Sequence, residues 1–594
     1  MAAPLNEQPV LIVGAGPTGL AAAMSLARAR IPVRLIDRAP RPAQHSRAIG
    51  IQARTLELFE QHRVVEPFLE AGHRLRAANL YSNGHRLARL DFDPLQTRYP
   101  YLLALDQTVT ERILTDHLAT FGVAIERGVE LVSLTQGASR VEVGLRQADG
   151  REETAHVTYV VAADGAHSTV RHLLGLNFAG KAFEQTFMLA DLHADSDLAD
   201  DEFHLFASGD GLAAIFPLGG GRHRFIADNP PGDPDGAPPR QEEEEASRVH
   251  AKGMAVMAEG EAHEVAAATS IEAREPPAPP IERLRAAAQR RIHRPLELSA
   301  LEWSSYFRLH SRMVEKLRVQ RAFLAGDAAH VHSPAGAQGM NTGIQEAFNL
   351  GWKLARVLSG HAPESLLDTY QTERHPIERD VLRQTSFITQ LAEAERGPLK
   401  LLRDRAMPML AAFGPLRDAA RLMVSELSIQ YRRSPLTLER VLDGGPRAGE
   451  RAPDALVQVI DGPLGRAPGT GYIYDLHDPA CYTLFLLVAL PIDARTRVDA
   501  TGALPPEAVG ADGDLERLAS TIDGALSGAV RIWRVTDAST GGGPSLTEAY
   551  GRTRPAFYLL RPDGYLCARG RPASDASALL RHCETWFAAA RKQR

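Results

Sequence analysis

The sequence predicts an α/β protein built on a parallel sheet, followed by at least one further α/β module. β-forming residues at Val10–Val13 lead into a glycine turn, a helix over Pro17–Arg30 and a second apolar strand at Val33–Ile36. Later strand runs at Val141–Leu145, Val157–Ala162 and Phe323–Ala325 are expected to join the same sheet, and the last two are followed by aspartate and glycine. This alternation of strand and helix, with strands far apart in the chain, is typical of a parallel sheet.

Composition restricts the class of protein further. The chain has 594 residues, of which 44% are hydrophobic and 24% charged, as in ordinary globular proteins. Wholesale disorder is therefore excluded. Lysine and arginine number 67 against 73 acidic residues, for a net charge of −6. That balance argues against a nucleic-acid partner, because such binding depends on a basic surface.

Cysteine usage and apolar runs bear on the compartment. Three scattered cysteines, Cys481, Cys567 and Cys583, fit neither a disulfide framework nor a zinc site, and we predict no metal. The run Tyr482–Pro491 is about half of the ~20 residues that cross a bilayer, and no signal peptide is visible before Pro9. We expect a cytoplasmic protein without a transmembrane segment.

The first chemical signal is a dinucleotide-binding fingerprint directly after the first strand. Its glycines permit a tight turn, a close approach of a pyrophosphate to the backbone and close helix–strand packing. The following helix N-terminus offers unpaired N–H groups to phosphates. Asp37 ends the second strand 23 residues after the first glycine, where it can accept hydrogen bonds from a ribose. The predicted residues are Gly14, Gly16, Pro17, Thr18, Gly19 and Asp37.

Two further signals follow downstream. Asp164-Gly165 ends an apolar strand, although this pair is also common in simple turns. Gly326-Asp327 ends another strand, and a loop containing Pro334, Gly336 and Gly339 then enters a helix near Asn341. No second complete Gly-x-Gly-x-x-Gly follows a strand, which disfavours a separate nicotinamide-binding domain.

Together, these three signals in this order resemble the class A flavoprotein monooxygenases, the FAD-dependent aromatic hydroxylases. The resemblance extends from Val10 through the segment Tyr370–Pro376. The C-terminal segments Gly445–Pro453 and Arg561–Tyr565 look like the thioredoxin-like domain of the longer members, such as phenol hydroxylase and polyketide hydroxylases. The Cys-x-x-Cys of a dithiol redox domain is absent, so packing or subunit contact is the role we expect for this domain.

The resemblance implies a Rossmann-like FAD-binding domain similar to that of p-hydroxybenzoate hydroxylase, formed by residues 1–180 and 296–376. A β-sheet substrate domain would occupy residues 181–295, with a proline-flanked helix over Gln241–Ala268. A helical segment would cover 377–443, and the thioredoxin-like domain 444–594.

Residue roles also follow from the resemblance. Asp37 would bind the adenosine ribose, with Arg38 beside the adenine and Arg47 reaching the pyrophosphate. Gln107, Arg112 and Asp327 would hold the ribityl and phosphate region, and Asp164 would bridge FAD and the nicotinamide. Backbone groups of Met340 and Asn341 would face the flavin, and the loop residues Pro334, Gly336, Gly326 and Gly339 would shape its surroundings. No catalytic side chain is identified.

The implied activity is NADH- or NADPH-dependent hydroxylation of a phenolic or polycyclic aromatic compound by molecular oxygen, through a flavin C4a-hydroperoxide. Epoxidation and Baeyer–Villiger insertion on the same scaffold stay open, because a fold does not determine the reaction. A flavin-bound protein without catalysis is a third hypothesis. A homodimer is also open.

Substrate-contacting residues are the least specified part. Leu205, Phe216, Pro217 and Phe225 are candidates, with Trp303, Tyr306 and Phe307 beside them, although core packing is the more common role of such residues. His45, His330 and His332 lie near the flavin motifs as candidate acid–base groups. Ile49-Gly50 occupies the stretch where phenol hydroxylase carries its base, so the deprotonating group is not identified.

Overall fold

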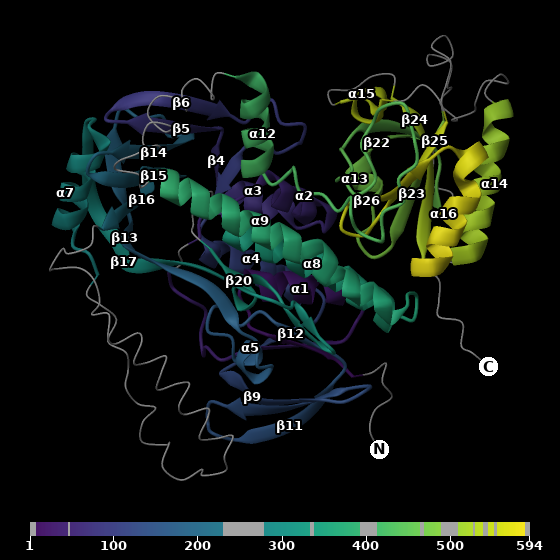
Figure 1. Ribbon diagram of the computed structural model, residues 1–594, viewed down its shortest axis with the longest axis horizontal. Helices are drawn as coiled ribbons and strands as arrows, with labels where there is room; N and C mark the ends of the chain where they lie inside the picture. The colour runs from purple at the N-terminus through teal and green to yellow at the C-terminus, as the bar shows by residue number, and fades with distance from the viewer. Residues whose placement is uncertain are drawn as a thin grey trace.

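A computed structural model describes residues 8–45, 48–229, 278–332, 338–392, 413–463, 469–488, 509–526, 529–538, 544–551 and 555–587. Two bodies lie side by side in it (Figure 1). The larger contains the N-terminal sheets and the long helices α8 and α9, and the smaller is the C-terminal module on the right of the view. The predicted helix Gln241–Ala268 lies outside the described residues.

The central six-stranded sheet has the order β18-β19-β12-β1-β2-β8, and four of its five pairings are parallel, the exception being the antiparallel β18–β19 pair. β1 is buried throughout, as expected for a parallel strand covered on both faces. The strands are β1 (Val10–Val13), β2 (Val33–Asp37), β8 (Ile125–Arg127), β12 (Val160–Ala162), β18 (Arg318–Val319) and β19 (Ala322–Leu324). The predicted parallel sheet, assembled from distant segments, is confirmed.

Not every strand run joined that sheet. The run Val141–Leu145 belongs instead to β10 (Val141–Gln147), in a three-stranded antiparallel sheet with β9 (Val129–Gln136) and β11 (Glu152–Val157). Its burial alternates along the strand, which is the pattern of a sheet with one face exposed. Short runs of β-formers do not reveal their pairing partner, so this assignment to the main sheet was wrong.

An eight-stranded sheet forms the second layer, with the order β20-β17-β13-β16-β15-β14-β5-β6. It draws β5–β6 and β17 from outside residues 181–295, so the sheet is larger than the predicted substrate domain. Helix α7 (Ile281–Ile292) covers its outer face. The strands are β5 (Ala77–Ser82), β6 (His85–Asp91), β13 (Phe178–Ser196), β14 (Glu202–Ser208), β15 (Gly211–Gly219), β16 (Arg222–Asn229), β17 (Leu296–Val314) and β20 (His330–Val331).

Helices join these layers. α8 (Gly339–Leu358) packs on α1 (Pro17–Arg28) through small side chains, and α9 (Asp368–Ala392) crosses the face of the molecule beside it (Figure 1). The remaining elements of this body are α2 (Ala53–Gln61), α3 (Val65–Ala71), α4 (Gln107–Ala119), α5 (Thr169–Leu173), α12 (Gly414–Val424), η3 (Gly326–Ala328), η4 (Glu364–Leu367) and a small sheet of β3 (Gly50–Ile51), β7 (Leu102–Ala104) and β4 (His73–Leu75).

The C-terminal module is a six-stranded mixed sheet of order β22-β21-β24-β23-β25-β26. Its elements are β21 (Leu456–Asp461), β22 (Gly469–Tyr472), α13 (Ile473–Leu476), β23 (Tyr482–Leu487), α14 (Val509–Leu526), β24 (Val530–Asp537), α15 (Leu546–Tyr550), β25 (Ala556–Leu560), β26 (Leu566–Gly570) and α16 (Pro572–Trp586). The predicted α/β class is confirmed here; the thioredoxin-like topology stays a prediction.

Cysteines in this module are buried rather than reactive. Burial raises the pKa of Cys481 to about 11 and that of Cys583 to about 12, so little thiolate forms at neutral pH. Cys567 and Cys583 belong to the same hydrophobic cluster. Thiol chemistry is therefore unfavourable in this module.

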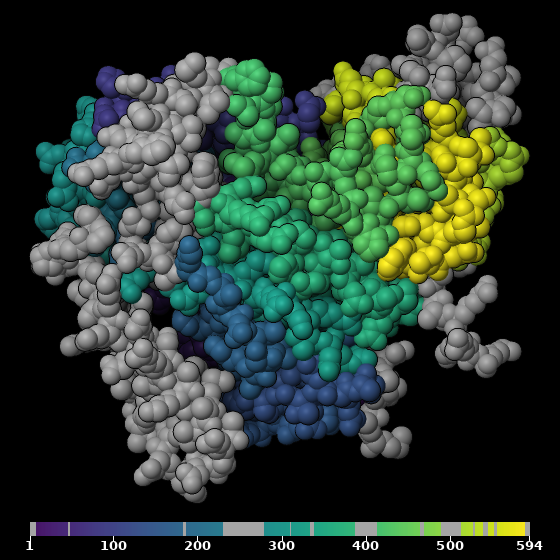
Figure 2. All heavy atoms as spheres, viewed as in Figure 1, coloured from purple at the N-terminus to yellow at the C-terminus, as the bar shows by residue number. Residues whose placement is uncertain are grey.

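A buried ion network joins the module to the larger body, and the two form a continuous surface (Figure 2). Arg561 donates two hydrogen bonds, of 2.6 and 2.9 Å, to the carboxylate of Glu373 in α9. Lys353 of α8 donates a third, of 2.7 Å, to the same carboxylate. Asp563 accepts from Trp352 at 3.0 Å and from Arg561. Because buried charges require partners, this junction constrains the module tightly against α8 and α9.

Glu373 is the shared anion of this network. We expect Glu373→Gln to lower the free energy of unfolding by roughly 3–5 kcal/mol, because two buried cations then lose a carboxylate. Urea unfolding followed by circular dichroism measures the change. Glu364→Gln serves as the control, since Glu364 pairs with Arg318 at a side-chain exposure of 52% and should cost no more than about 1 kcal/mol. Equal losses in the two variants would contradict the network's importance.

Candidate functional site

The three sequence signals meet at one edge of the central sheet. β1 pairs with β12, and β12 pairs with β19, all in parallel, so the turns that follow these strands emerge at the same edge. Gly14 sits there with φ +103°, and a Cβ on it would lie 2.2 Å from the carbonyl oxygen of Ala163. Only glycine allows the first turn to approach the second signal this closely.

Thr18 makes the corresponding contact with the third signal. A Cβ on Gly326, whose φ is +58°, would lie 2.6 Å from the Thr18 hydroxyl oxygen. Thr18 stands in the first turn of α1, within the glycine fingerprint. The helix that follows the first motif is therefore in van der Waals contact with the turn of the third.

A pocket of about 210 Å³ opens at this edge. It receives residues from the first and second signals and from the start of β9. Gly16 contributes no side chain, and a Cβ there would meet open space. The lining residues are Val13, Gly14, Gly16, Asp37, Arg38, Val129, Glu130, Leu131, Ala163, Asp164, Gly165 and Thr169.

Asp37 is held in place by backbone hydrogen bonds. Its Oδ2 accepts from the Ala15 N–H and its Oδ1 from the Ala39 N–H, each at 2.8 Å. Arg127 approaches Oδ2 at 3.6 Å. The carboxylate thus lies beside the glycine turn, on the pocket wall, with lone pairs left for a ribose hydroxyl.

Asp164 is the pocket residue that has an unused hydrogen-bond acceptor. Its Oδ2 accepts from the Val170 N–H at 3.2 Å, whereas its Oδ1 is buried without a hydrogen-bond partner. Burial raises the pKa of this carboxyl above its usual value. An orphaned polar atom on a pocket wall fits a bound group with hydroxyl or amide donors, so these residues fit a dinucleotide such as FAD.

Arg171 links the second and third signals, a role that the sequence did not suggest. Its guanidinium donates to the carbonyl oxygens of Ala166 at 2.7 Å and Ala328 at 3.1 Å. It is 3% exposed and stands in α5, just after the Asp-Gly turn. Arg171 therefore holds the turn after β12 against the turn after β19.

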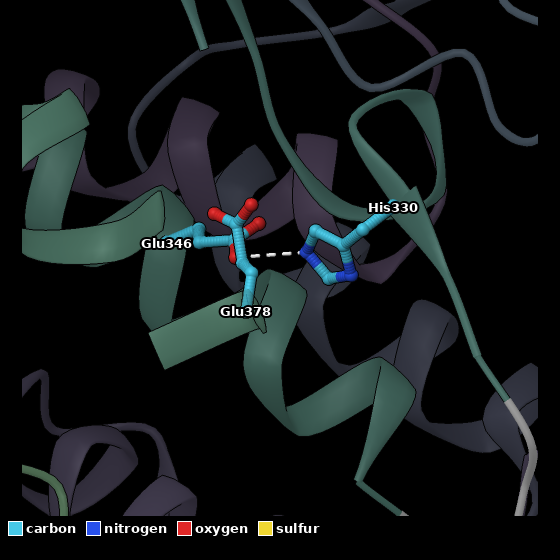
Figure 3. Close-up of side chains that lie close together, drawn as sticks. All are labelled: His330, Glu346 and Glu378. Carbon is cyan, nitrogen blue, oxygen red and sulfur yellow. Dashed lines mark hydrogen bonds and ion pairs between the residues drawn. The ribbon is translucent and has the colours of Figure 1, made fainter. Parts of the chain in front are cut away.

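A cluster of buried ionisable side chains holds the turn at Gly326, in the third signal (Figure 3). Glu346 of α8 accepts from the Gly326 N–H and from His330 Nε2, both at 2.8 Å. Arg374 of α9 lies 3.6 Å from the same carboxylate. Glu378 is also buried here, and one side-chain nitrogen or oxygen atom from each of His330, Glu346 and Glu378 lies within 4.8 Å of the other two. His330 is thus a partner of Glu346 rather than a solvent-facing acid or base.

The charges in this cluster differ between its two carboxyl groups. Burial raises the pKa of Glu378 well above its usual value, and the negative charge of Glu346 adds to that rise. Burial also acts on Glu346, but His330 and Arg374 outweigh it and hold the pKa of Glu346 well below its usual range. We infer an ionised Glu346 beside a protonated Glu378.

The N-terminus of α8 begins after the loop of the third signal. The side chain of Asn341 is occupied, since it accepts from the Gln52 N–H and donates to the Gly50 carbonyl oxygen, each at 2.9 Å. Met340 is half-buried in the same turn. Contact of the backbone N–H groups of Met340 and Asn341 with the flavin stays a prediction.

Other predicted cofactor residues occupy different positions. Arg38 lines the pocket, and Asp327 is exposed within η3. Gln107 donates to Glu111 at 2.7 Å, and Arg112 is exposed on α4; neither belongs to the pocket. These roles remain predictions. Arg47, Pro334 and Gly336 lie outside the described residues.

The candidate substrate residues divide between two faces of the eight-stranded sheet. Phe225 and Tyr306 join the cluster under α7, where Phe225 is fully buried, so the structure gives them a packing role. Phe216 and Phe307 lie on the other face, because successive side chains of a strand alternate. Pro217 is buried, and Leu205 is 36% exposed at the sheet surface.

That second face lies against the layer built on the central sheet, which we call the FAD-binding part. The ring of His45 stacks on Trp303 at a centroid distance of 5.2 Å, and Asp106 lies 3.5 Å from Arg224 of β16. Phe225 faces α7 instead, and its contact with substrate stays a prediction, because alternation along a strand reveals two faces but does not tell which one meets the substrate.

Among the described residues, no helix is long and apolar enough to span a bilayer.

The family model described as an FAD binding domain matches residues 7–385. The chain is 35% identical to 6-methylpretetramide 4-monooxygenase of Streptomyces rimosus, over 96% of this chain and 92% of that relative. It is also 35% identical to pentachlorophenol 4-monooxygenase of Sphingobium chlorophenolicum, over 75% of each.

A solved structure agrees over the whole length. The OxyS anhydrotetracycline hydroxylase from Streptomyces rimosus aligns with 98% of this chain and 99% of its own, at a TM-score of 0.69 and 27% identity. The likeness thus includes the C-terminal module as well as the FAD-binding part.

Asp37 offers the direct test of the pocket. We expect Asp37→Ala to weaken FAD binding roughly tenfold or more, because hydrogen bonds from the ribose to a carboxylate are lost. Fluorescence titration of the apoprotein with FAD measures this. Asp149→Ala removes an exposed carboxylate outside the pocket and serves as the control. Retention of FAD as tight as in the parent protein would show that Asp37 does not bind the ribose.

Glu346 and Glu378 allow a matched comparison within the cluster. Glu346→Gln should destabilise the protein by roughly 1–3 kcal/mol, because one of its donors then loses its acceptor. Glu378→Gln should change little, because an amide resembles a protonated carboxyl group. Urea unfolding of both variants measures the difference. A larger loss in Glu378→Gln would mean that the charge assignment is reversed.

Proposed function

The chain belongs to the FAD-dependent aromatic monooxygenase family, and from this premise we propose that it hydroxylates a polycyclic phenol with NADH or NADPH and molecular oxygen. The observation that supports the proposal most is the meeting of all three motifs at one edge of the central sheet, where the first two line a pocket. When bound, FAD supplies the redox chemistry and the activation of oxygen.

A polycyclic substrate fits the extent of the likeness better than a small phenol. The similarity to the pretetramide monooxygenase and to the anhydrotetracycline hydroxylase covers nearly the whole chain. The similarity to the pentachlorophenol enzyme covers three quarters. The site that binds the ring would lie between the inner face of the eight-stranded sheet and the FAD-binding part, where Trp303 and Phe307 already stand.

The residues of this chain would bind, orient and exclude water. Asp37 and the first turn of α1 would hold the adenosine diphosphate part, and Asp164 would present its unpaired oxygen to the cofactor. The first turn of α8 would direct backbone N–H groups to the edge of the flavin that becomes negative on reduction, a placement worth a few kcal/mol in preorganised sites. Aromatic side chains near the ring would keep out water.

Turnover measurements test this function. The purified protein should be yellow, and a polycyclic phenol should accelerate its NADH or NADPH oxidation, with one atom of ¹⁸O₂ appearing in the product. Mass spectrometry counts the incorporated oxygen, and NMR spectroscopy of the isolated product distinguishes a hydroxylated ring from an epoxide or an inserted ester oxygen, which have the same mass. Tight FAD binding with no substrate-stimulated oxidation would instead favour a binding protein. Heat-denatured protein with free FAD is the control.

A further inference from the structure

Arg224 of β16 is buried at the junction of the eight-stranded sheet and the FAD-binding part. It is 1% exposed, and its Nε and Nη2 donate to the two oxygens of Asp191, each at 2.7 Å. Nη2 also lies 3.5 Å from Asp106, which precedes α4. The two hydrogen bonds to Asp191 fix the plane of the guanidinium group, and with it the direction of the remaining edge, which carries Nη1.

That remaining edge has no acceptor among the described residues. Nη1 of Arg224 is buried and makes no hydrogen bond. An unsatisfied buried donor costs about 1–3 kcal/mol, and more for a charged group, so an acceptor is expected where the protein supplies none. Asp191 already neutralises the guanidinium, and Asp106 is near. A neutral oxygen therefore suits this edge better than a second carboxylate does.

The surroundings of Arg224 are aromatic. Its Cζ lies 6.0 Å from the ring of Trp303, which stacks on His45. Phe187 and Phe307 stack at 5.6 Å on this same inner face, in a cluster that Trp303 joins. Apolar walls with one convergent polar donor are the usual composition of a small-molecule site.

We propose that Arg224 donates its Nη1 hydrogen to a hydroxyl or carbonyl oxygen on the aromatic substrate and so orients the ring toward the flavin. This rests on the proposed function and adds the group that sets the position of attack. Asp191 and Asp106 act as positioning residues, since they hold the guanidinium without touching the substrate. The hydrogen bond from Nη1 is made to a single oxygen substituent of the substrate. An aromatic ring without that substituent therefore cannot form it.

The test compares two ring systems that differ by one hydroxyl group. The holoenzyme is titrated with 2-naphthol and with naphthalene, and flavin absorbance reports the dissociation constants. Arg224→Lys can keep a cation on Asp191 but removes the second guanidinium edge. We expect this variant to lose roughly tenfold or more in its affinity for 2-naphthol relative to naphthalene.

Arg291 of α7 provides the matched control. It is equally buried at 1%, yet its nitrogens all have partners: Asp228 at 2.7 and 3.0 Å and the Ala287 carbonyl oxygen at 3.3 Å. Arg291→Lys should disturb packing on the outer face and leave the affinity ratio of the two probes unchanged. A similar shift in both variants would assign the effect to general loosening and overturn the proposal.

Other results are equally decisive. An unchanged ratio in Arg224→Lys overturns the proposal, as does weakened FAD binding with an unchanged ratio, which would make the flavin the acceptor. Failure of the wild type to bind either probe would contradict an aromatic site on this face. The proposed function is judged separately, because ¹⁸O incorporation by the wild type can succeed whatever Arg224 does.

Discussion

The parallel pairing of β1 with β12, and of β12 with β19, is the constraint on which the site depends. Backbone hydrogen bonds bring three segments, far apart in the sequence, to one edge of a sheet. The turns at that edge can pack only where side chains are missing, at Gly14 against Ala163 and at Gly326 against Thr18. A nucleotide pocket results because the glycines leave backbone exposed where phosphates need to approach.

Buried ion pairs connect this edge of the central sheet to the rest of the molecule. α8 carries Glu346, which holds the turn at Gly326, and also Lys353, which meets Glu373 in the network of the C-terminal module. Both clusters are shielded from water, where an unpaired charge is expensive. α8 is therefore fixed at its beginning by the third motif and further along by the C-terminal module.

Sequence reasoning succeeded where a local pattern has one structural solution. The glycine fingerprint with Asp37 required a strand, a tight turn and a helix, and the structure has them. It failed, or left the answer open, where pairing or orientation depends on distant residues. Val141–Leu145 has the composition of any strand, and its partners were not visible. Phe225 alternates with its neighbours as expected, yet which face meets the cofactor depends on where α7 packs.

The order of the motifs by itself determined the nucleotide-binding class, because each motif's spacing dictates a backbone conformation that few other functions need. The tertiary structure decided which side chains share an environment. The orphaned oxygen of Asp164, the pairing of Glu346 with Gly326 and His330, and the unpaired nitrogen of Arg224 follow from packing between segments far apart in the chain. Such contacts have no local signature, since burial and distance arise only when the layers close on one another.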